Sequence, residues 1–497
     1  MPSLLGIDNG LTVTKAVIFD IDGSVLAVAR RRVPQSQPKP HFVERDMDAL
    51  WQATAQAIAE AISLSGRPAA DIVAVAATAH GDGVFLLDAS HRPLGPGILS
   101  LDSRAGGTVS DWADKADAAL TLTGQIPHAS APSALLGWIK QNETERYGKI
   151  AHVLSCKDWL RFCLTGQIAT DTTEASTSFT NVHSQTYSPE ALTLFGLERL
   201  THALPPILHP SAIAGDITPQ AAALTGLIAG TPVAAGLHDV TASALGIGGH
   251  AEGVVALVAG TYSINEVVSA QPQTDRRWFC RNAIEPGKWN NMAISPASAA
   301  NYDWILETLC ADLSTEANIH AALAPEITEA LARPSTVLFH PYLYGSPHGP
   351  TASAGFFGLR GWHKRGDLCR AVLEGIVFNH RVHLDALRAG FPVTEARLTG
   401  GVSRNKTFAQ MFADVLGMPV TTSKTEEAAA WGAALCAGAA VGLYTSPFAD
   451  PRDLAALQET FTPDSTRAAA YEARYRLHCK LSAALAPLWP EIEALDA

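Results

Sequence analysis

The chain has 497 residues, of which 36 are Lys or Arg and 48 are Asp or Glu, so its formal net charge at pH 7 is −12. This acidic balance argues against a nucleic-acid-binding protein, because phosphate contacts require clustered Lys and Arg. Charged residues make up 17% of the chain and hydrophobic residues 47%. That composition excludes global disorder, and the length suits about two to four globular domains.

The cysteines and the apolar stretches limit the class further. Seven cysteines occur without a C-x-x-C motif or a Cys/His cluster, so we expect neither a disulfide framework nor a structural zinc site. No basic region precedes the first apolar residues, as it would in a signal peptide. The most apolar stretch, residues 221–245, is interrupted by glycine, proline and polar residues and lacks the ~20 apolar residues of a membrane span. We therefore expect a soluble, cytoplasmic protein with no membrane or nucleic-acid partner.

The first residues are expected to form a strand meander. Three β-type runs, at residues 4–8, 15–20 and 25–29, are separated by Asn-Gly and Asp-Gly pairs, which are strong turn signals. A helix over 46–64 and a buried strand over 72–77 follow. This order of elements is typical of an α/β domain.

A similar order of elements returns in the second half. An apolar run at 254–259 precedes a turn of glycine and hydroxyl residues, and a strand follows at 264–268. We interpret the repeat as a weak internal duplication of two α/β domains, residues 1–246 and 247–497, divided in a glycine-rich stretch. A long helix is expected over 368–387, before a short strand and further helices.

The turn between the first two expected strands carries groups that suit phosphate oxygens. Gly10 exposes backbone N–H groups, Thr12 adds a hydroxyl and Lys15 adds a cation. Asp8 could hold Mg²⁺ through water. A plain polar hairpin would carry the same residues, so this turn by itself leaves both interpretations open.

Two further glycine turns have the same character. Gly260 and Thr261 repeat the arrangement in the second half, so that two loops could clamp one phosphate chain, although either would also suit a simple strand turn. Later a strand enters Gly400-Gly401, and a helix follows Asn405. Glycines admit a ligand close to the backbone and a helix N-terminus favours anions, so this segment suits a nucleotide. A Gly-Gly pair at a strand end is also a common turn.

Asp239 follows an apolar run that ends near the expected domain boundary. A carboxylate in this place can accept the proton of a substrate hydroxyl during phosphoryl transfer. The same residue also fits the N-cap of the helix that follows.

His80 and Asp82 come directly after the strand at 72–77, at the edge where α/β sheets bind ligands. They could bind sugar hydroxyls, although a lone histidine of this kind is usually structural. Asp102 and Arg104 follow a similar apolar run and could close the same pocket.

Together these motifs resemble the FGGY family of carbohydrate kinases, within the superfamily of sugar kinases, actin and heat-shock chaperones. The resemblance covers nearly the whole chain. It is carried by the Gly-Ile-Asp-Asn-Gly run at 6–10, by Gly260-Thr261, by residues 398–405 with their extension to 417, and by 354–359 with the helix that follows. It implies an α/β protein of two actin-like ATPase (ribonuclease H-like) domains with a nucleotide and sugar cleft between them.

The resemblance also implies roles for single residues. Asp239 matches the catalytic base, which also binds the sugar, and Asp8 matches the acidic residue near Mg²⁺. The N-terminal domain would bind sugar and the C-terminal domain ATP. The residues that match ATP-binding positions are Gly10, Thr12, Lys15, Gly260, Thr261, Gly400, Gly401 and Asn405. His80 and Asp82 fall at sugar-binding positions, beside the candidates Asp102 and Arg104.

Departures from the family pattern bear on the acceptor. Leu11 replaces a common Thr, and the trio 80–82 is neither the Gln-Arg-Glu of glycerol kinases nor the Gln-Met-His of typical D-xylulose kinases. Residues 85–88, 202–206 and 343–346 resemble L-xylulose kinases. The resemblance therefore implies phosphoryl transfer from Mg-ATP to a pentulose such as xylulose or a related ketose. Dimers are common in the family, so the resemblance also suggests a homodimer, and the oligomeric state stays open.

Two other functions stay open. A polyol kinase for erythritol, ribitol or glycerol would use the same phosphate loops, and activity on ketoses against polyols separates the two. A non-catalytic sugar sensor would keep the fold, but retention of Asp8, Asp239 and both phosphate loops weighs against it. A chaperone or an actin-like assembly protein would have no use for Asp239.

Overall fold

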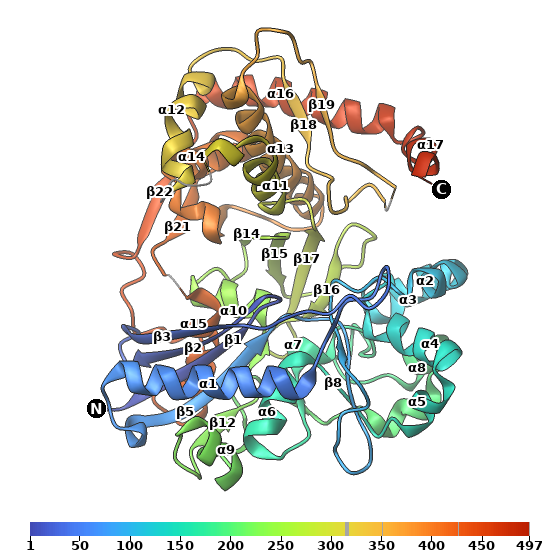
Figure 1. The fold of residues 1–497 in the computed structure, drawn as a ribbon, viewed down its shortest axis with the longest axis vertical. Helices are drawn as coiled ribbons and strands as arrows, with labels where there is room; N and C mark the ends of the chain where they lie inside the picture. The colour runs from blue at the N-terminus through green and yellow to red at the C-terminus, as the bar shows by residue number, and fades with distance from the viewer. Residues whose placement is uncertain (314–317, 350, 426, 497) are drawn as a thin grey trace. The chain divides into compact units, whose positions relative to one another are not determined.

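The computed structural model describes residues 1–313, 318–349, 351–425 and 427–496 (Figure 1). The chain divides into two compact units, each a mixed α/β assembly. The first unit comprises Met1–His250, Val268–Asn291 and Thr425–Leu454, and the second comprises Ala251–Val267, Met292–Lys424 and Ala455–Ala497. No helix in the described part of the chain is long and apolar enough to cross a membrane.

The first unit is built on a sheet with the strand order β11-β12-β5-β1-β2-β3. β1 (Ser3–Asn9), β2 (Val13–Asp20) and β3 (Val25–Arg32) form the predicted antiparallel meander. β5 (Ile72–Ala79) runs parallel to β1 and is buried almost throughout, as its unbroken apolar sequence predicts. β13 (Leu237–His238) also pairs with the end of β5.

Two helices cover opposite faces of this sheet, because side chains alternate along each strand. Leu5, Ile7 and their neighbours pack with α1 (Met47–Ser65), whose predicted N-cap Asp46 accepts a hydrogen bond from the Ala49 N–H. Leu4, Val17 and Phe19 pack with α15 (Ala428–Ala440) on the other face. Figure 1 shows α1 in front of the strands and α15 behind them.

The remaining elements of the first unit surround the sheet. They are β4 (Glu44–Arg45), β6 (Phe85–Leu87), β7 (Gly97–Ile98), α2 (Gly106–Asp111), α3 (Ala116–Thr123), α4 (Pro132–Asn142), α5 (Thr144–Lys149), β8 (His152–Leu154), α6 (Cys156–Thr165), β9 (Thr170–Asp171), α7 (Thr172–Ala175), α8 (Pro189–Leu194), β10 (Ile207–Leu208), β11 (Ile213–Asp216), α9 (Pro219–Thr225), β12 (Pro232–Ala234) and α10 (Asp239–Gly246).

Glycines let α10 and α15 approach each other closely. A Cβ at Gly432 would lie 2.1 Å from the Ala242 carbonyl oxygen, and a Cβ at Gly246 would lie 2.0 Å from that of Ala428. Any side chain at either position would therefore push the two helices apart. This packing holds the helix whose first residue is Asp239.

A second sheet has the order β16-β17-β15-β14-β20-β21-β22. β14 pairs antiparallel with β15 and parallel with β20, as β1 does with β2 and β5, so the predicted internal duplication is present in the strand pairing. The strands are β14 (Val254–Ala259), β15 (Ser263–Ser269), β16 (Phe279–Asn282), β17 (Trp289–Ser295), β20 (Glu395–Thr399), β21 (Val420–Ser423) and β22 (Gln458–Phe461).

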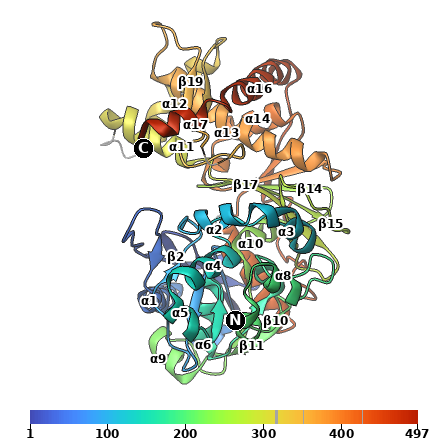
Figure 2. The same ribbon diagram turned by 90° about the vertical axis from the view of Figure 1, so that its right-hand side faces the viewer.

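Helices of the second unit pack around α13 (Arg365–Arg388), which matches the long helix expected over 368–387. Figure 2 shows α13, α14 and α16 grouped together within this unit. The other elements are α11 (Ala300–Leu309), α12 (Ile319–Leu331), β18 (Leu338–His340), β19 (Gly355–Phe357), α14 (Lys406–Leu416), α16 (Ser465–Leu485) and α17 (Trp489–Glu493).

Candidate functional site

The turn between β1 and β2 brings Asp8 and Lys15 together as partners across the two strands. The Lys15 ammonium lies 3.2 Å from Asp8 Oδ2 and 3.0 Å from Glu427 Oε2. Burial raises the pKa of Asp8, although the charge of Lys15 opposes that rise. Lys15 is thus held between two carboxylates, one of which, Glu427, had no local signal in the sequence.

A buried cation holds the tip of this turn in place. Arg45, 1% exposed, donates to Asn9 Oδ1 at 3.3 Å and to the Gly10 carbonyl at 3.4 Å, and it also contacts the Leu11 carbonyl. Thr12 stays exposed at the tip. Sequence reasoning missed Arg45 because it lies outside the turn motif, in the two-residue strand β4.

Strand pairing places the next candidate beside the same turn. The His80 N–H donates to the Asn9 carbonyl at 3.0 Å. Both ring nitrogens of His80 are buried without a hydrogen-bond partner among the described residues. Burial, reinforced by the charge of Arg45, lowers the pKa of His80 to about 3, so the ring is neutral at physiological pH.

Asp239 is the first residue of α10, directly after the end of β13. His238 is the N-cap residue, so the interpretation of Asp239 as the N-cap is wrong. The Asp239 side chain is 29% exposed, and its Oδ1 lies 3.5 Å from His238 Nδ1. Burial first, and the charge of Arg281 next, lower the pKa of His238 to about 4. The position of Asp239 at the N-terminus of α10 stabilises negative charge on its carboxylate.

Asp82 lies on the loop after β5, close to the same end of β13. A Cβ at Gly81 would lie 1.8 Å from His238 Nε2, so this loop packs directly on the residue before Asp239. The structure therefore brings together three of the side chains expected at the sugar site, namely His80, Asp82 and Asp239. The described contacts do not include a link from Asp102 or Arg104 to this group.

Asp102 and Arg104 instead belong to a buried ion-pair cluster. Arg104 pairs with Asp102 at 2.7 Å and with Glu44 at 2.7 Å, and its guanidinium lies 3.8 Å above the centre of the Phe42 ring. Asp102 also accepts a hydrogen bond from the Val43 N–H at 2.6 Å. These contacts give both residues a structural role, and their part in sugar binding stays a prediction.

A cavity of about 790 Å³ lies within the second unit. Gly260, Thr261, Gly401 and Asn405 line it, so four of the predicted nucleotide residues come together there. Gly400 lies next to it with φ +104°, and a Cβ there would lie 2.4 Å from the Ala259 carbonyl oxygen. The Asn405 side chain caps α14 by accepting from the Phe408 N–H at 3.1 Å.

The walls of this cavity suit a nucleoside. Its volume falls in the usual range for small-molecule sites, and apolar side chains face glycine backbone and the N-terminus of α14. Sequence reasoning missed the contribution of α11 and α12, because these helices carry no motif. The lining side chains from helices include Tyr302, Ile327, Leu331, Leu373, Phe408 and Met411.

The described residues hold no group of three or more His, Cys, Asp or Glu side chains that could bind a metal ion. The site that the resemblance implies does not need one, because Mg²⁺ is usually held by one or two carboxylates, the nucleotide phosphates and water. Asp8, which is 15% exposed at the β1–β2 turn, fits that part.

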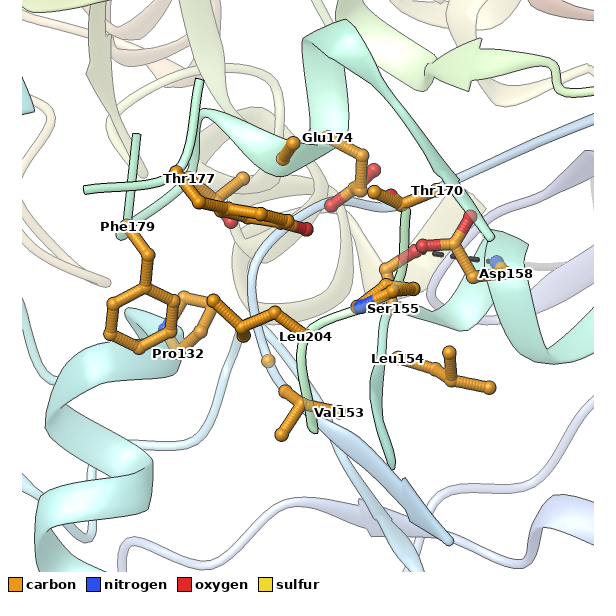
Figure 3. A pocket seen from close by; sticks show the side chains of 14 residues that line it. Pro132, Val153, Leu154, Ser155, Asp158, Thr170, Glu174, Thr177, Phe179 and Leu204 are labelled. Carbon is orange, nitrogen blue, oxygen red and sulfur yellow. Dashed lines mark hydrogen bonds between the residues drawn. The ribbon is translucent and has the colours of Figure 1, made fainter. Parts of the chain in front are cut away.

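A second cavity, of about 40 Å³, lies in the first unit among β8, α6 and α7 (Figure 3). Glu174, Asp158, Ser155 and Thr170 surround it, and burial raises the pKa of Glu174 well above its usual range. The volume admits water molecules but no sugar. This cavity is therefore not the acceptor site.

Comparison with known proteins agrees with this arrangement of residues. Residues 3–246 match the N-terminal domain of the FGGY family of carbohydrate kinases, and residues 255–441 match its C-terminal domain. The chain is 36% identical to a probable L-xylulose kinase of Pasteurella multocida, over 97% of this chain and 98% of that protein. It is 35% identical to the L-xylulose/3-keto-L-gulonate kinase of Escherichia coli, over 97% of each.

A solved structure gives the same result. The crystal structure of xylulose kinase from Rhodospirillum rubrum superposes with a TM-score of 0.86 at 30% identity, over 98% of this chain and 99% of that one. The expected fold class is confirmed, and kinases of this family use ATP as the phosphate donor. The chain belongs to the FGGY family of carbohydrate kinases.

Proposed function

We propose that the protein transfers the γ-phosphoryl group of ATP to a hydroxyl of a pentulose, with xylulose as the expected acceptor. The observation that carries the proposal is the meeting of His80, Asp82 and Asp239 at the ends of β5 and β13. One partly exposed carboxylate there stands among groups that can bind sugar hydroxyls. The names of the probable L-xylulose kinase and of the L-xylulose/3-keto-L-gulonate kinase support a ketose acceptor.

Asp239 is the proposed catalytic base. Its carboxylate orients the attacking hydroxyl and takes its proton late in the transfer, because an alcohol is a weak acid. The α10 N-terminus keeps that carboxylate ionised before the reaction.

The phosphate loops are the proposed donor side. Thr12 and the backbone N–H groups near Gly10 would contact the phosphates in the first loop, and Gly260 and Thr261 would do so in the second. Mg²⁺, held through water by Asp8, would neutralise charge on the phosphates. Lys15 is bound to Asp8 and Glu427, so it would fix the Asp8 carboxylate. The same ammonium group would also meet the phosphoryl group.

The two domains expected from the sequence divide the work in this proposal. Residues 1–246 would bind the sugar, and residues 247–497 would bind ATP in the 790 Å³ cavity. We place the reaction in the cytoplasm, where ATP is supplied and thiols stay reduced. The homodimer implied by the resemblance stays a prediction.

The test is ADP formation with Mg-ATP and a panel of tetroses, pentuloses, hexuloses and polyols. Strong stimulation by a pentulose supports the proposal. Stimulation by erythritol, ribitol or glycerol instead would make the protein a polyol kinase. ATP binding without stimulation by any acceptor would favour a sugar sensor and overturn the proposal.

A further inference from the structure

The Asp82 backbone is held in an unusual conformation. Its φ is +57°, in the left-handed region that side chains other than Asn and Asp seldom occupy, and Gly81 and Gly83 flank it. The contact of Gly81 with the His238 ring fixes the position of this loop. Asp82 is therefore presented at a defined place beside Asp239.

Both carboxylate oxygens of Asp82 are engaged by other segments. Oδ1 accepts from Arg281 Nη2 at 2.9 Å, and Oδ2 lies 3.5 Å from His128 Nε2. Burial alone would raise the pKa of Asp82, but the Arg281 guanidinium and the His128 ring hold it well below its usual range. The carboxylate is thus charged, and its charge is matched by a cation.

Arg281 is fixed as tightly as its partner. It lies on β16 with its side chain 2% exposed, and its Nε donates to Gln125 Oε1 at 3.1 Å. The guanidinium lies 4.9 Å from the centre of the Phe279 ring, which packs on the His128 ring at 5.2 Å. These contacts hold the guanidinium in place directly behind Asp82.

The side chains differ in how far they reach the surface. Asp82 is 17% exposed and His128 is 29% exposed, whereas Arg281 is covered. An acceptor therefore meets the carboxylate and the imidazole first, with the guanidinium behind them. Asp82 accepts hydrogen bonds from hydroxyls, and the His128 ring can accept or donate them. We call Asp82, His128 and Arg281 together the acceptor wall.

Charge decides what this wall admits. A free arginine would bind a carboxylate with two parallel hydrogen bonds. Here Asp82 already takes that place, so the carboxylate of a sugar acid would meet a like charge that cannot move away. An uncharged ketose meets no such repulsion.

We propose that Arg281, paired with Asp82 and supported by His128, is a specificity determinant that admits uncharged ketoses and rejects sugar acids. The inference rests on the proposed function and names its substrate class more closely. Arg281 acts through Asp82, so it is a positioning residue for the acceptor wall. Replacing Asp82 by Asn would free the guanidinium and turn the wall toward acids.

The experiment compares kcat/KM for xylulose with kcat/KM for xylonate, an acid with the same number of carbons. The wild type is expected to prefer xylulose. Asp82→Asn should shift the ratio toward xylonate by at least about tenfold. Adding Arg281→Met to that variant should remove the gain, because no cation then remains to bind the acid.

Two controls keep the test decisive. Asp111→Asn, the same change at the exposed end of α2, should leave the ratio unaltered. Arg281→Lys is used if Arg281→Met fails to fold. It keeps a cation beside Asp82, so this variant should keep the preference for xylulose. Protection of Asp82→Asn from thermal unfolding by xylonate gives a reading that does not depend on turnover.

The outcomes separate the two claims. A ratio that stays within about twofold of the wild type in Asp82→Asn overturns the inference alone. The same holds if the wild type uses xylonate as well as xylulose. If none of the acceptors stimulates ADP formation by the wild type, the proposed function fails and the inference falls with it.

Discussion

Thr173 Oγ1 accepts a 2.9 Å hydrogen bond from the backbone N–H of His238, the residue immediately before Asp239. The Thr173 hydroxyl in turn donates to Asp171 Oδ1 at 2.5 Å, and Asp171 is ion-paired at 2.9 Å with Lys157. Lys157 also donates to the Ala235 carbonyl. The segment that ends at Asp239 is thus tied at both ends to a buried ionic cluster.

Loss of the Thr173 hydroxyl should misplace Asp239 without removing any proposed substrate contact. We expect Thr173→Val to lower kcat by about tenfold to a hundredfold with little change in KM for ATP. Thr173→Ser keeps the hydroxyl and should retain most of the activity. Steady-state kinetics on both variants check this, and equal activity of Val and Ser variants would show that the hydrogen bond has no positioning role.

The close contact of α10 with α15 makes Gly432 intolerant of a side chain. Gly432→Ala would drive its Cβ to 2.1 Å from the Ala242 carbonyl oxygen, so we expect a loss of about 1–3 kcal/mol in the free energy of unfolding. Gly148→Ala, in the exposed helix α5, has no atom within 4 Å of its new Cβ and should not destabilise the protein. Urea unfolding of both variants measures the difference; equal stability would contradict the packing described.

The cap of α14 allows structure and nucleotide binding to be separated. Asn405→Ala removes the cap and should cost about 1 kcal/mol of stability as well as raise KM for ATP. Asn405→Asp preserves the cap but adds a negative charge to the cavity in which the nucleotide is proposed to bind. We therefore expect near-normal urea unfolding and a raised KM for ATP in Asn405→Asp, and an unchanged KM in that variant would remove Asn405 from the nucleotide site.

Buried neutral histidines make stability depend on pH. Burial, reinforced by the charge of Lys288, lowers the pKa of His250 from 6.5 to about 4. Between these values the unfolded chain binds more protons than the folded one, so the free energy of unfolding falls as the pH drops from about 6.5 to about 4. This destabilisation is absent above pH 6.5.

His250→Gln tests that effect at one residue. The variant should lose up to about 1.4 kcal/mol per pH unit from the slope of unfolding free energy against pH in this window. Urea unfolding at several pH values between 4.5 and 7.5 measures the slope, and the value at pH 7.5 reports the packing change alone. A variant slope as steep as that of the wild type would show that His250 titrates normally.

Local signals were enough to predict much of the fold. Asn-Gly and Asp-Gly turns delimit β1, β2 and β3, and Asp46 marks the start of α1, so these elements lie within a few residues of the expected bounds. His80 and Asp82 were expected near a ligand because they follow a buried strand, and β5 ends at Ala79 as that argument requires.

The unpredicted parts of the site depend on contacts between distant segments. Glu427 meets Lys15 across about 400 residues of chain, and Arg281 meets Asp82 across about 200. Neither Glu427 nor Arg281 belongs to a motif. No periodicity or spacing in the sequence indicates such a pair. A charged residue on an otherwise buried strand, such as Arg281 on β16, is the one signal that could have marked it.

The central claim is that Asp239 is the base that accepts the sugar hydroxyl proton. The most direct measurement is ketose-dependent ADP formation by Asp239→Asn, beside the wild type and Asp111→Asn. We predict that Asp239→Asn unfolds at the wild-type temperature and still binds ATP but loses about 10²- to 10⁴-fold in kcat, while Asp111→Asn stays active. Near-normal turnover of Asp239→Asn would contradict the account.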